Sequence, residues 1–389
     1  MSTDSTDPAD SRWIRWVRRL AIPVSVAVGV GALGGGAFYY FAEVRRPAVR
    51  HSNPTAARRV ATTHILVSID GGVDASTAVA LIGKTGNGPK ILTIPASTVL
   101  EVPGVGPRTI ALALRQSGPQ SAAVTVANGL RLTVPSTLSG TAAVAARTID
   151  ALGGVTVTVP KDLRVAARGS IFSAGSSHMN GDAFIRYMTG SFLDESAADR
   201  DDRQEAGWRA VLSALTQPGA AAADLSAWTT DVPAETALAL LRACAQSPAA
   251  LTLPTTLIGL AGNDLVRLDE GRLPQLRRAL GDFTNGAETL DGRRIRLVVG
   301  ASGAIGSAVG RILVNAGYVI EMSGKSVRPA DLTTIAVSPS AGDAKATGQD
   351  VAGLLGLGSV RVSTDISADA DIILTVGMDW AEANGFPQR

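Results

Sequence analysis

The feature that most constrains this chain is a long uncharged run near its N-terminus, from Leu20 to Ala42. At ~1.5 Å of rise per helical residue, the run is long enough to cross a hydrocarbon core of ~30 Å. Tryptophans precede it and aromatic residues 38–41 close it, as in the interfacial belts of a membrane span. A signal-peptide core is usually shorter, ~7–15 residues, so the pattern predicts an uncleaved single transmembrane helix.

The arginines beside the run do not decide its orientation. Four lie in the tail, residues 1–19, and five follow within the basic, proline-interrupted segment 43–62. The positive-inside rule counts these residues, and four against five gives no bias. A short N-terminal tail usually stays inside. We therefore expect the tail in the cytoplasm, 43–62 as a juxtamembrane linker, and the following chain outside the plasma membrane.

Composition limits the remaining 389 − 42 = 347 residues, which suffice for two domains. The net charge of +2 gives no electrostatic argument for binding nucleic acid. Cys244 is the single cysteine, so it cannot form an internal disulfide and does not indicate a redox compartment. The three histidines are scattered without ligand spacing, so no zinc site is predicted.

The pattern after the linker predicts an α/β fold. Short apolar runs alternate with helical patterns, and residues 155–160 (VTVTVP) show clear period-two alternation. We expect strands at 64–69, 77–82, 90–94 and 155–159, and helices at 109–116, 142–152, 204–215, 233–247 and 273–283.

A polar stretch at 284–292 is predicted to be a domain linker, and strands and helices alternate again behind it. Such alternation predicts a second, smaller α/β domain. Its expected strands are 295–299, 318–322, 334–337, 359–362 and 371–376, with helices at 305–316 and 344–355. The predicted division of the chain is 1–19, 20–42, 43–62, 63–285 and 286–389.

The turn from Gly300 to Gly306 has the look of a dinucleotide fingerprint, because it follows a strand and opens a helix. Two observations favour the plainer interpretation that a tight strand-to-helix turn needs glycine. Only 389 − 306 = 83 residues follow, too few for a full nucleotide domain with a substrate region. None of the four tyrosines heads a Tyr-x-x-x-Lys pair. We expect no NAD binding.

The C-terminal block, residues 293–380, resembles the LytR C-terminal domain. That family reads as a strand, a glycine turn, a helix, an Ala-Gly-Tyr strand entry and a closing strand before Gly-x-Asp. Here the entry is Ala316-Gly317-Tyr318 and the close is Gly377-Met378-Asp379.

The preceding region, about 63–285, resembles the LytR–CpsA–Psr domain. Four segments match in the family's order: Leu92–Pro95 followed by VPGVG, Ile149–Pro160 around Gly-Gly-Val, Asn180–Tyr187, and Arg200–Gln204 with the pattern R-x-x-R-Q. Proteins of this family are membrane-anchored and extracytoplasmic. The resemblance implies transfer of a glycopolymer from a polyprenyl-phosphate lipid onto peptidoglycan, with Mg²⁺ held by carboxylates and the phosphates neutralised by arginines.

The departures from the family fall on that chemistry. The residues that stand where the family carries arginines or carboxylates are Ala96 and Ser97, Thr189 and Ser191, Ser76, and Ala197. The resemblance leaves Asp70, Arg200, Arg203 and Gln204 as ligand-binding candidates, with Asp70 also a candidate metal ligand. Four nearby residues could replace the missing groups: Asp74, Arg186, Asp194 and Asp199. For Arg200 and Arg203 the plain alternative is a solvated helix N-terminus flanked by acids.

The sequence therefore predicts a single-span envelope protein of α/β class, with a degenerate LytR–CpsA–Psr-like domain and a LytR C-terminal-type domain. The leading hypothesis is non-catalytic: binding of an envelope lipid or glycan, or pairing with an active enzyme of the family. Polyprenyl-phosphate lipid and peptidoglycan are the implied ligands. The alternative is a glycopolymer–peptidoglycan phosphotransferase with relocated metal ligands, which would use Mg²⁺.

Overall fold

The computed structural model describes residues 63–72, 76–165, 169–193, 195–258, 264–284, 293–300, 303–326 and 328–386. The expected tail, span and basic linker lie outside these residues, as does most of the linker expected at 284–292. Within the described ranges, no helix combines the length and the apolar character needed to cross a bilayer.

A six-stranded sheet in the order β11-β6-β1-β2-β3-β12 forms the centre of the first part. Its strands are β1 (His64–Asp70), β2 (Thr77–Thr85), β3 (Gly88–Thr93), β6 (Thr137–Thr141), β11 (Thr229–Thr230) and β12 (Ala249–Thr252). The first three run antiparallel in sequence order, while β6 lies parallel to β1 and β12 parallel to β3. The strands expected from the apolar runs at 64–69, 77–82 and 90–94 are confirmed.

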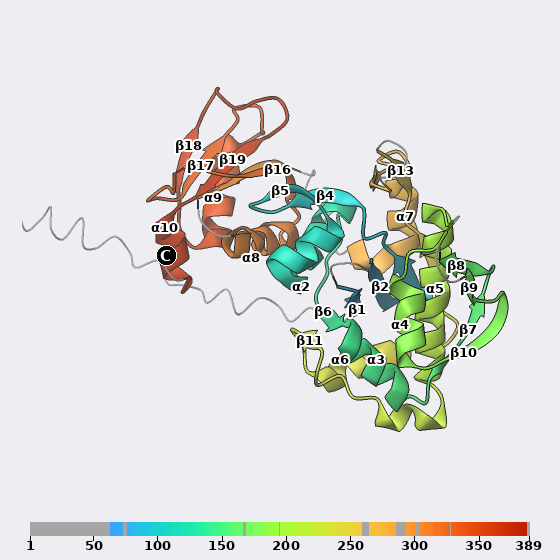
Figure 1. The fold of residues 1–389 in the computed structure, drawn as a ribbon. Helices are drawn as coiled ribbons and strands as arrows, with labels where there is room; N and C mark the ends of the chain where they lie inside the picture. The colour runs from blue at the N-terminus through green and yellow to red at the C-terminus, as the bar shows by residue number, and fades with distance from the viewer. Residues whose placement is uncertain are drawn as a thin grey trace, which may run out of the picture. The chain divides into compact units, whose positions relative to one another are not determined.

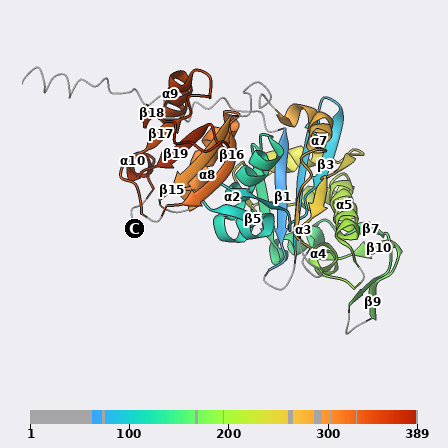
Figure 2. The same cartoon turned by 90° about the horizontal axis from the view of Figure 1, so that it is seen from above.

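Strand β1 is buried on both faces because helices cover both sides of the sheet. Ile65, Val67 and Ile69 belong to one apolar cluster, whereas Leu66 belongs to another, as the period-two alternation of a strand requires. The first cluster contains residues of α3 (Ala142–Ala151), α4 (Gly181–Thr189), α5 (Ala197–Ala214) and α6 (Ala234–Ala243). The second contains residues of α2 (Ile110–Leu130) and α7 (Leu273–Leu280). Figures 1 and 2 show these α/β/α layers.

Short hairpins and turns complete this part. They are β4 (Val99–Val102) with β5 (Gly106–Thr109), β7 (Val155–Val159) with β10 (Gly175–Met179), β8 (Leu163–Val165) with β9 (Gly169–Phe172), β13 (Thr255–Leu257) with β14 (Val266–Leu268), and the 3₁₀ turns η2 (Pro218–Ala222) and η3 (Gly281–Thr284). Helix α2 is kinked, because Gly118 has φ 83° and ψ 173° and Pro119 follows it.

The C-terminal part is built on a five-stranded sheet in the order β16-β15-β19-β17-β18. The strands are β15 (Arg294–Val299), β16 (Val319–Lys325), β17 (Thr334–Val337), β18 (Ser359–Val362) and β19 (Ile372–Val376). The accompanying helices are α8 (Gly303–Asn315), α9 (Ala344–Leu355) and α10 (Met378–Ala383). The expected strands and helices are confirmed, with α10 in addition. Only the β17–β19 pair is antiparallel, so the sheet is mixed.

Helix α2 and the β4–β5 hairpin hold the C-terminal sheet at its β16 edge (Figure 1). The side-chain amide of Asn128 donates to the carbonyl of Ile320 and accepts from its backbone N–H, each at 2.8 Å. The carboxylate of Glu101 accepts hydrogen bonds from the hydroxyl, at 2.8 Å, and the backbone N–H of Ser323. Val124 and Ala127 of α2 belong to the apolar core of the C-terminal sheet.

This contact explains Gly306 of the suspected fingerprint and Gly310, one turn further along α8. A Cβ atom on Gly306 would lie 2.5 Å from the carbonyl oxygen of Pro103 and 2.6 Å from the Cα of Gly104. On Gly310 it would lie 2.7 Å from the Cβ of Pro103. Helix α8 therefore needs glycine to approach the β4–β5 turn. This packing supplies the plain reason for the motif, and the absence of NAD binding stays a prediction.

Candidate functional site

A cleft of about 250 Å³ lies between α2 and α5, at the end of the six-stranded sheet where β2 begins and β3 ends. The beginning of β2, the turn after β3 and the first turns of both helices form its walls. Its lining consists of Ser76, Thr77, Pro95, Ala96, Ser97, Thr109, Ala111, Arg115, Ala197, Arg200, Asp201 and Gln204. Two of the four residues predicted for the site, Arg200 and Gln204, line this cleft directly.

Asp70 lies at the end of β1 and is paired with Arg115 of α2. Its Oδ1 is 3.1 Å from Nε of Arg115, and it also accepts from the backbone N–H of Gly72 at 3.2 Å. Arg115 donates further to the carbonyl of Gly72 at 2.7 Å. Both side chains are about one-third exposed, at 36% and 30%. The carboxylate predicted as a ligand is thus neutralised by an arginine on the wall of the cleft.

Arg115 was missed by sequence reasoning. The helical pattern at 109–116 predicts its helix, but no spacing rule joins it to Asp70, because 45 residues separate the two in sequence. The antiparallel β1–β2 pair and the start of α2 bring them together only in the fold.

The start of α5 positions the other candidates. Ser196 caps the helix and Asp199 returns a hydrogen bond to the backbone N–H of Ser196, a capping box that starts the helix at Ala197. Arg200 therefore stands in the first turn and faces the cleft with 22% of its side chain exposed. It pairs with Glu195 at 3.4 Å and with Asp264 at 3.1 Å.

Arg203 is completely buried, and so is the side chain of its partner Glu195. The guanidinium donates to both carboxylate oxygens, at 2.5 and 3.0 Å, and to the carbonyl of Gly190 at 3.0 Å. It also lies over the rings of Phe192 and Tyr187, at 4.9 and 5.6 Å from the centroids. Burial raises the pKa of Tyr187 to about 12. The guanidinium is shielded from solvent, and its Nη1 lacks a hydrogen-bond partner among the described residues.

The other candidates are divided between the cleft wall and the surface. Gln204 is buried and its side-chain amide donates to the carbonyl of Met188 at 3.0 Å, which fixes α4 to α5. Asp199 pairs with Lys161 at 2.7 Å, and this hydrogen bond, with those from Ser196, lowers its pKa to about 2. Arg186 is exposed on α4. Asp74 and Asp194 lie outside the described residues.

Asp201 is a second residue that sequence reasoning missed. It lines the cleft beside Arg200, one position along α5. Burial raises its pKa to about 7, with the carboxylates of Asp202 and Glu195 adding to the rise and Arg200 opposing it. An ionised Asp201 would repel a phosphate group in the cleft, since like charges repel. The acidic run at 201–202 was visible in the sequence, but its orientation toward the cleft was not.

The carboxylate predicted as a metal ligand, Asp70, is already paired with an arginine in the described part of the chain. Magnesium takes oxygen ligands, and one or more carboxylates are usual among them. Within the part of the chain that the structure describes, no group of three or more His, Cys, Asp or Glu residues is placed to hold a metal ion. Asp70, the candidate ligand, is bound to Arg115, whose charge would repel a cation.

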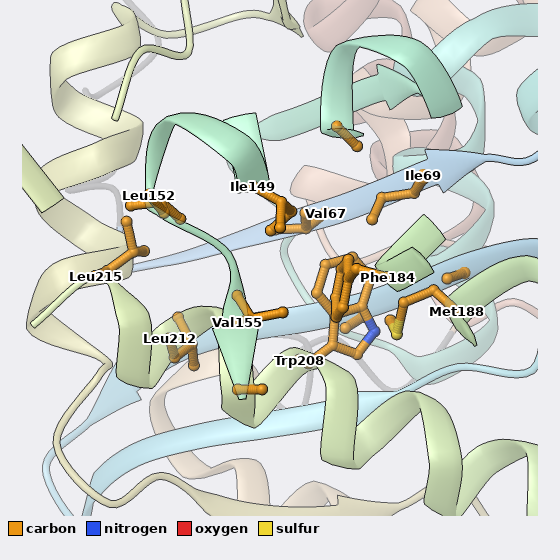
Figure 3. Close-up of a cluster of buried hydrophobic side chains, with 14 of the residues drawn as sticks. Val67, Ile69, Ile149, Leu152, Val155, Phe184, Met188, Trp208, Leu212 and Leu215 are labelled. Atoms are coloured by element: carbon orange, nitrogen blue, oxygen red, sulfur yellow. The ribbon is translucent and has the colours of Figure 1, made fainter. Parts of the chain in front are cut away.

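Figure 3 shows buried side chains of the core between the sheet and helices α3 to α6, and this core contains a small apolar cavity. Its volume is about 40 Å³, and its walls include Val67 and Ile69 of β1, Ile149 of α3, Phe184 of α4 and Trp208 of α5. A water molecule's share of the liquid is about 30 Å³, so the cavity holds little more than that volume. The indole N–H of Trp208 is buried and lacks a hydrogen-bond partner among the described residues.

Comparisons with known proteins relate this part of the chain to a described family. The LytR–CpsA–Psr family model matches residues 74–243, and no curated protein matches. TagV of B. subtilis is 20% identical, with a TM-score of 0.47 over 57% of this chain and 97% of that one. A LytR-Csp2A-Psr enzyme from Actinomyces oris is 21% identical, with a TM-score of 0.47 over 56% and 89%.

B. subtilis TagT is 18% identical, with a TM-score of 0.47 over 57% of this chain and 91% of that one. A further structure shows TagT bound to LI-WTA, with the same identity and TM-score over 56% and 88%. The assignment of the family rests on the match to the family model and not on these likenesses. Residues 74–243 of this chain form a domain of the LytR–CpsA–Psr family.

Proposed function

We propose that this protein is a membrane-anchored, non-catalytic cell-envelope protein that uses its LytR–CpsA–Psr domain to bind a glycan or a lipid-linked glycan. One observation carries the proposal: each arginine that lines the cleft is already paired with a carboxylate of the chain itself. Arg115 is paired with Asp70, and Arg200 is paired with Glu195 and Asp264.

Transfer of a phosphate-linked glycan needs cationic groups that stabilise charge developing on the phosphates. An arginine that a carboxylate has neutralised contributes less to that charge, and breaking the pair has its own cost. Arg203, the other arginine of the R-x-x-R-Q motif, is paired with Glu195 within the core. The loss of one preorganised contact typically lowers a rate ~10²–10³-fold, so the combined departures support a domain that binds but does not turn over.

The apolar cavity supports weak binding of a lipid chain at most. At about 40 Å³ it is far too small for a polyprenyl chain, and helices α3 and α5 would have to separate to admit one. The structure bound to LI-WTA concerns TagT, and a glycopolymer ligand for the present chain follows from it only as part of this proposal.

The proposal includes the topology and the C-terminal part. The uncharged run at 20–42 supports a single-pass anchor in the plasma membrane, with residues 43 onward outside. The Ala-Gly-Tyr strand entry and the Gly-x-Asp close support a LytR C-terminal-type domain. A non-catalytic binding domain of this kind could act by pairing with an active enzyme of the family, and we include that pairing in the proposal.

The decisive experiment incubates the full chain in detergent with polyprenyl-pyrophosphate-linked glycan and Mg²⁺. We expect no Mg²⁺-dependent release of the lipid phosphate, and glycan binding that does not require the metal. Asp70→Ala and Arg203→Ala serve as companion variants, with Lys161→Ala on the exposed Asp199 pair as the control. Turnover that is abolished in Asp70→Ala but retained in Lys161→Ala would contradict this proposal. The protein would then be a phosphotransferase with relocated metal ligands.

A further inference from the structure

Among the described residues that line the cleft, Asp201 carries the one acidic side chain. It stands between Arg200 and Gln204 on the α5 wall, and Arg115 approaches from α2 on the opposite wall. A ligand in the cleft therefore meets this carboxyl group directly. In a pocket built for phosphates, a carboxylate at such a position would be an obstacle.

The surrounding charges do not offset the carboxylate. Three arginines stand in or beside the cleft and four carboxylates accompany them: Arg115, Arg200 and Arg203 against Asp70, Glu195, Asp201 and Asp264. Each arginine has a carboxylate partner other than Asp201. With Asp202 included, the carboxylates outnumber the arginines even when Asp201 is protonated, and ionisation of Asp201 adds one further negative charge.

The groups around Asp201 bring the pKa of its carboxyl group close to neutral pH. Burial disfavours the charged form, and Asp202 and Glu195 add repulsion, while Arg200 favours the charged form. The pKa of Asp201 is raised to about 7 as a result. The carboxyl group is therefore protonated at pH 5.5 and ionised at pH 8.5.

We propose that Asp201 is a specificity-determining residue that excludes dianionic phosphate groups from the cleft as a carboxylate and admits them as a carboxyl. Above neutrality the cleft then accepts the uncharged, hydroxyl-rich part of a glycan, whose hydroxyl groups can donate hydrogen bonds to the carboxylate. This inference deepens the proposed function by naming the ligand class of the same cleft.

Inorganic sulfate tests the inference, because its two charges stay constant between pH 5.5 and 8.5. Binding is measured by isothermal titration of the full chain in detergent at low ionic strength, where charge effects are least screened. We expect the wild-type dissociation constant to rise at least about tenfold from pH 5.5 to pH 8.5, a change of about 1.4 kcal/mol in binding free energy. Asp201→Asn should bind sulfate at both pH values about as tightly as the wild type does at pH 5.5.

Glu205→Gln is the matched control, since Glu205 lies on the same helix, is paired with Arg209 and does not line the cleft. It should keep the wild-type pH dependence. Equal pH dependence in wild type and Asp201→Asn would overturn the inference, and so would failure of both to bind sulfate. The turnover assay reports on the proposed function by itself. If the protein shows turnover and sulfate binding by Asp201→Asn does not change with pH, the non-catalytic proposal fails but this inference holds.

Discussion

At the scale of single residues, the arginines in and beside the cleft are each paired with a carboxylate of the chain. Arg203 shows this most clearly, because its guanidinium and the Glu195 carboxylate are buried together beside two aromatic rings. Removing one partner of such a pair leaves an uncompensated charge in the core, which typically costs about 3–5 kcal/mol.

Glu195→Gln should therefore lower the free energy of unfolding by about 3 kcal/mol, measured by urea denaturation followed by tryptophan fluorescence. The exposed pair between Arg209 and Glu205, one turn apart on α5, provides the control. Glu205→Gln should change the unfolding free energy by less than about 0.5 kcal/mol. Equal effects of the two substitutions would show that the buried pair is not a stabilising unit.

At the scale of elements, most of the secondary structure was predictable and the site was not. The strand at 64–69 and the helix at 344–355 follow from periodicity and capping residues, which act locally. The pairing of Asp70 with Arg115 and the direction of Asp201 depend on how α2 and α5 pack on the sheet, which a single sequence does not specify. The family resemblance named positions on α5, but not their burial.

The contact of α2 with the edge strand β16 yields an element-scale prediction. Asn128→Ala would leave the N–H and C=O of Ile320 without the partner that now serves both, at a cost of about 2 kcal/mol. Hydrogen exchange of the Ile320 amide should quicken about tenfold or more, while amides of β1 keep their protection. Asn315→Ala, an exposed asparagine at the end of α8, is the control and should leave both unchanged. Unaltered exchange at Ile320 in Asn128→Ala would contradict the role assigned to this side chain.

At the scale of the whole molecule, the proposed function requires that the folded part lie outside the membrane. A reporter that is active only after export, fused behind Arg389, should be active in the full chain. Deletion of residues 20–42 should abolish its activity, because the uncharged run is the only export signal the proposal invokes. Activity of a cytoplasm-restricted reporter at the same position would reject the topology and the envelope role with it.

The two hydrogen bonds between the Asn128 side chain and the Ile320 backbone have a consequence for aggregation. Strand β16 is an edge of its sheet, and an edge strand exposes a ladder of unpaired donors and acceptors to which another chain can add. The Asn128 side chain bonds the N–H and C=O of Ile320 as a neighbouring strand would, and the Glu101 carboxylate accepts a hydrogen bond from Ser323 further along β16. A fragment that begins at residue 293 would lose both covers and the apolar contact with α2. The first part of the chain thus protects one of the two edges of the C-terminal sheet, β16, from pairing with another chain.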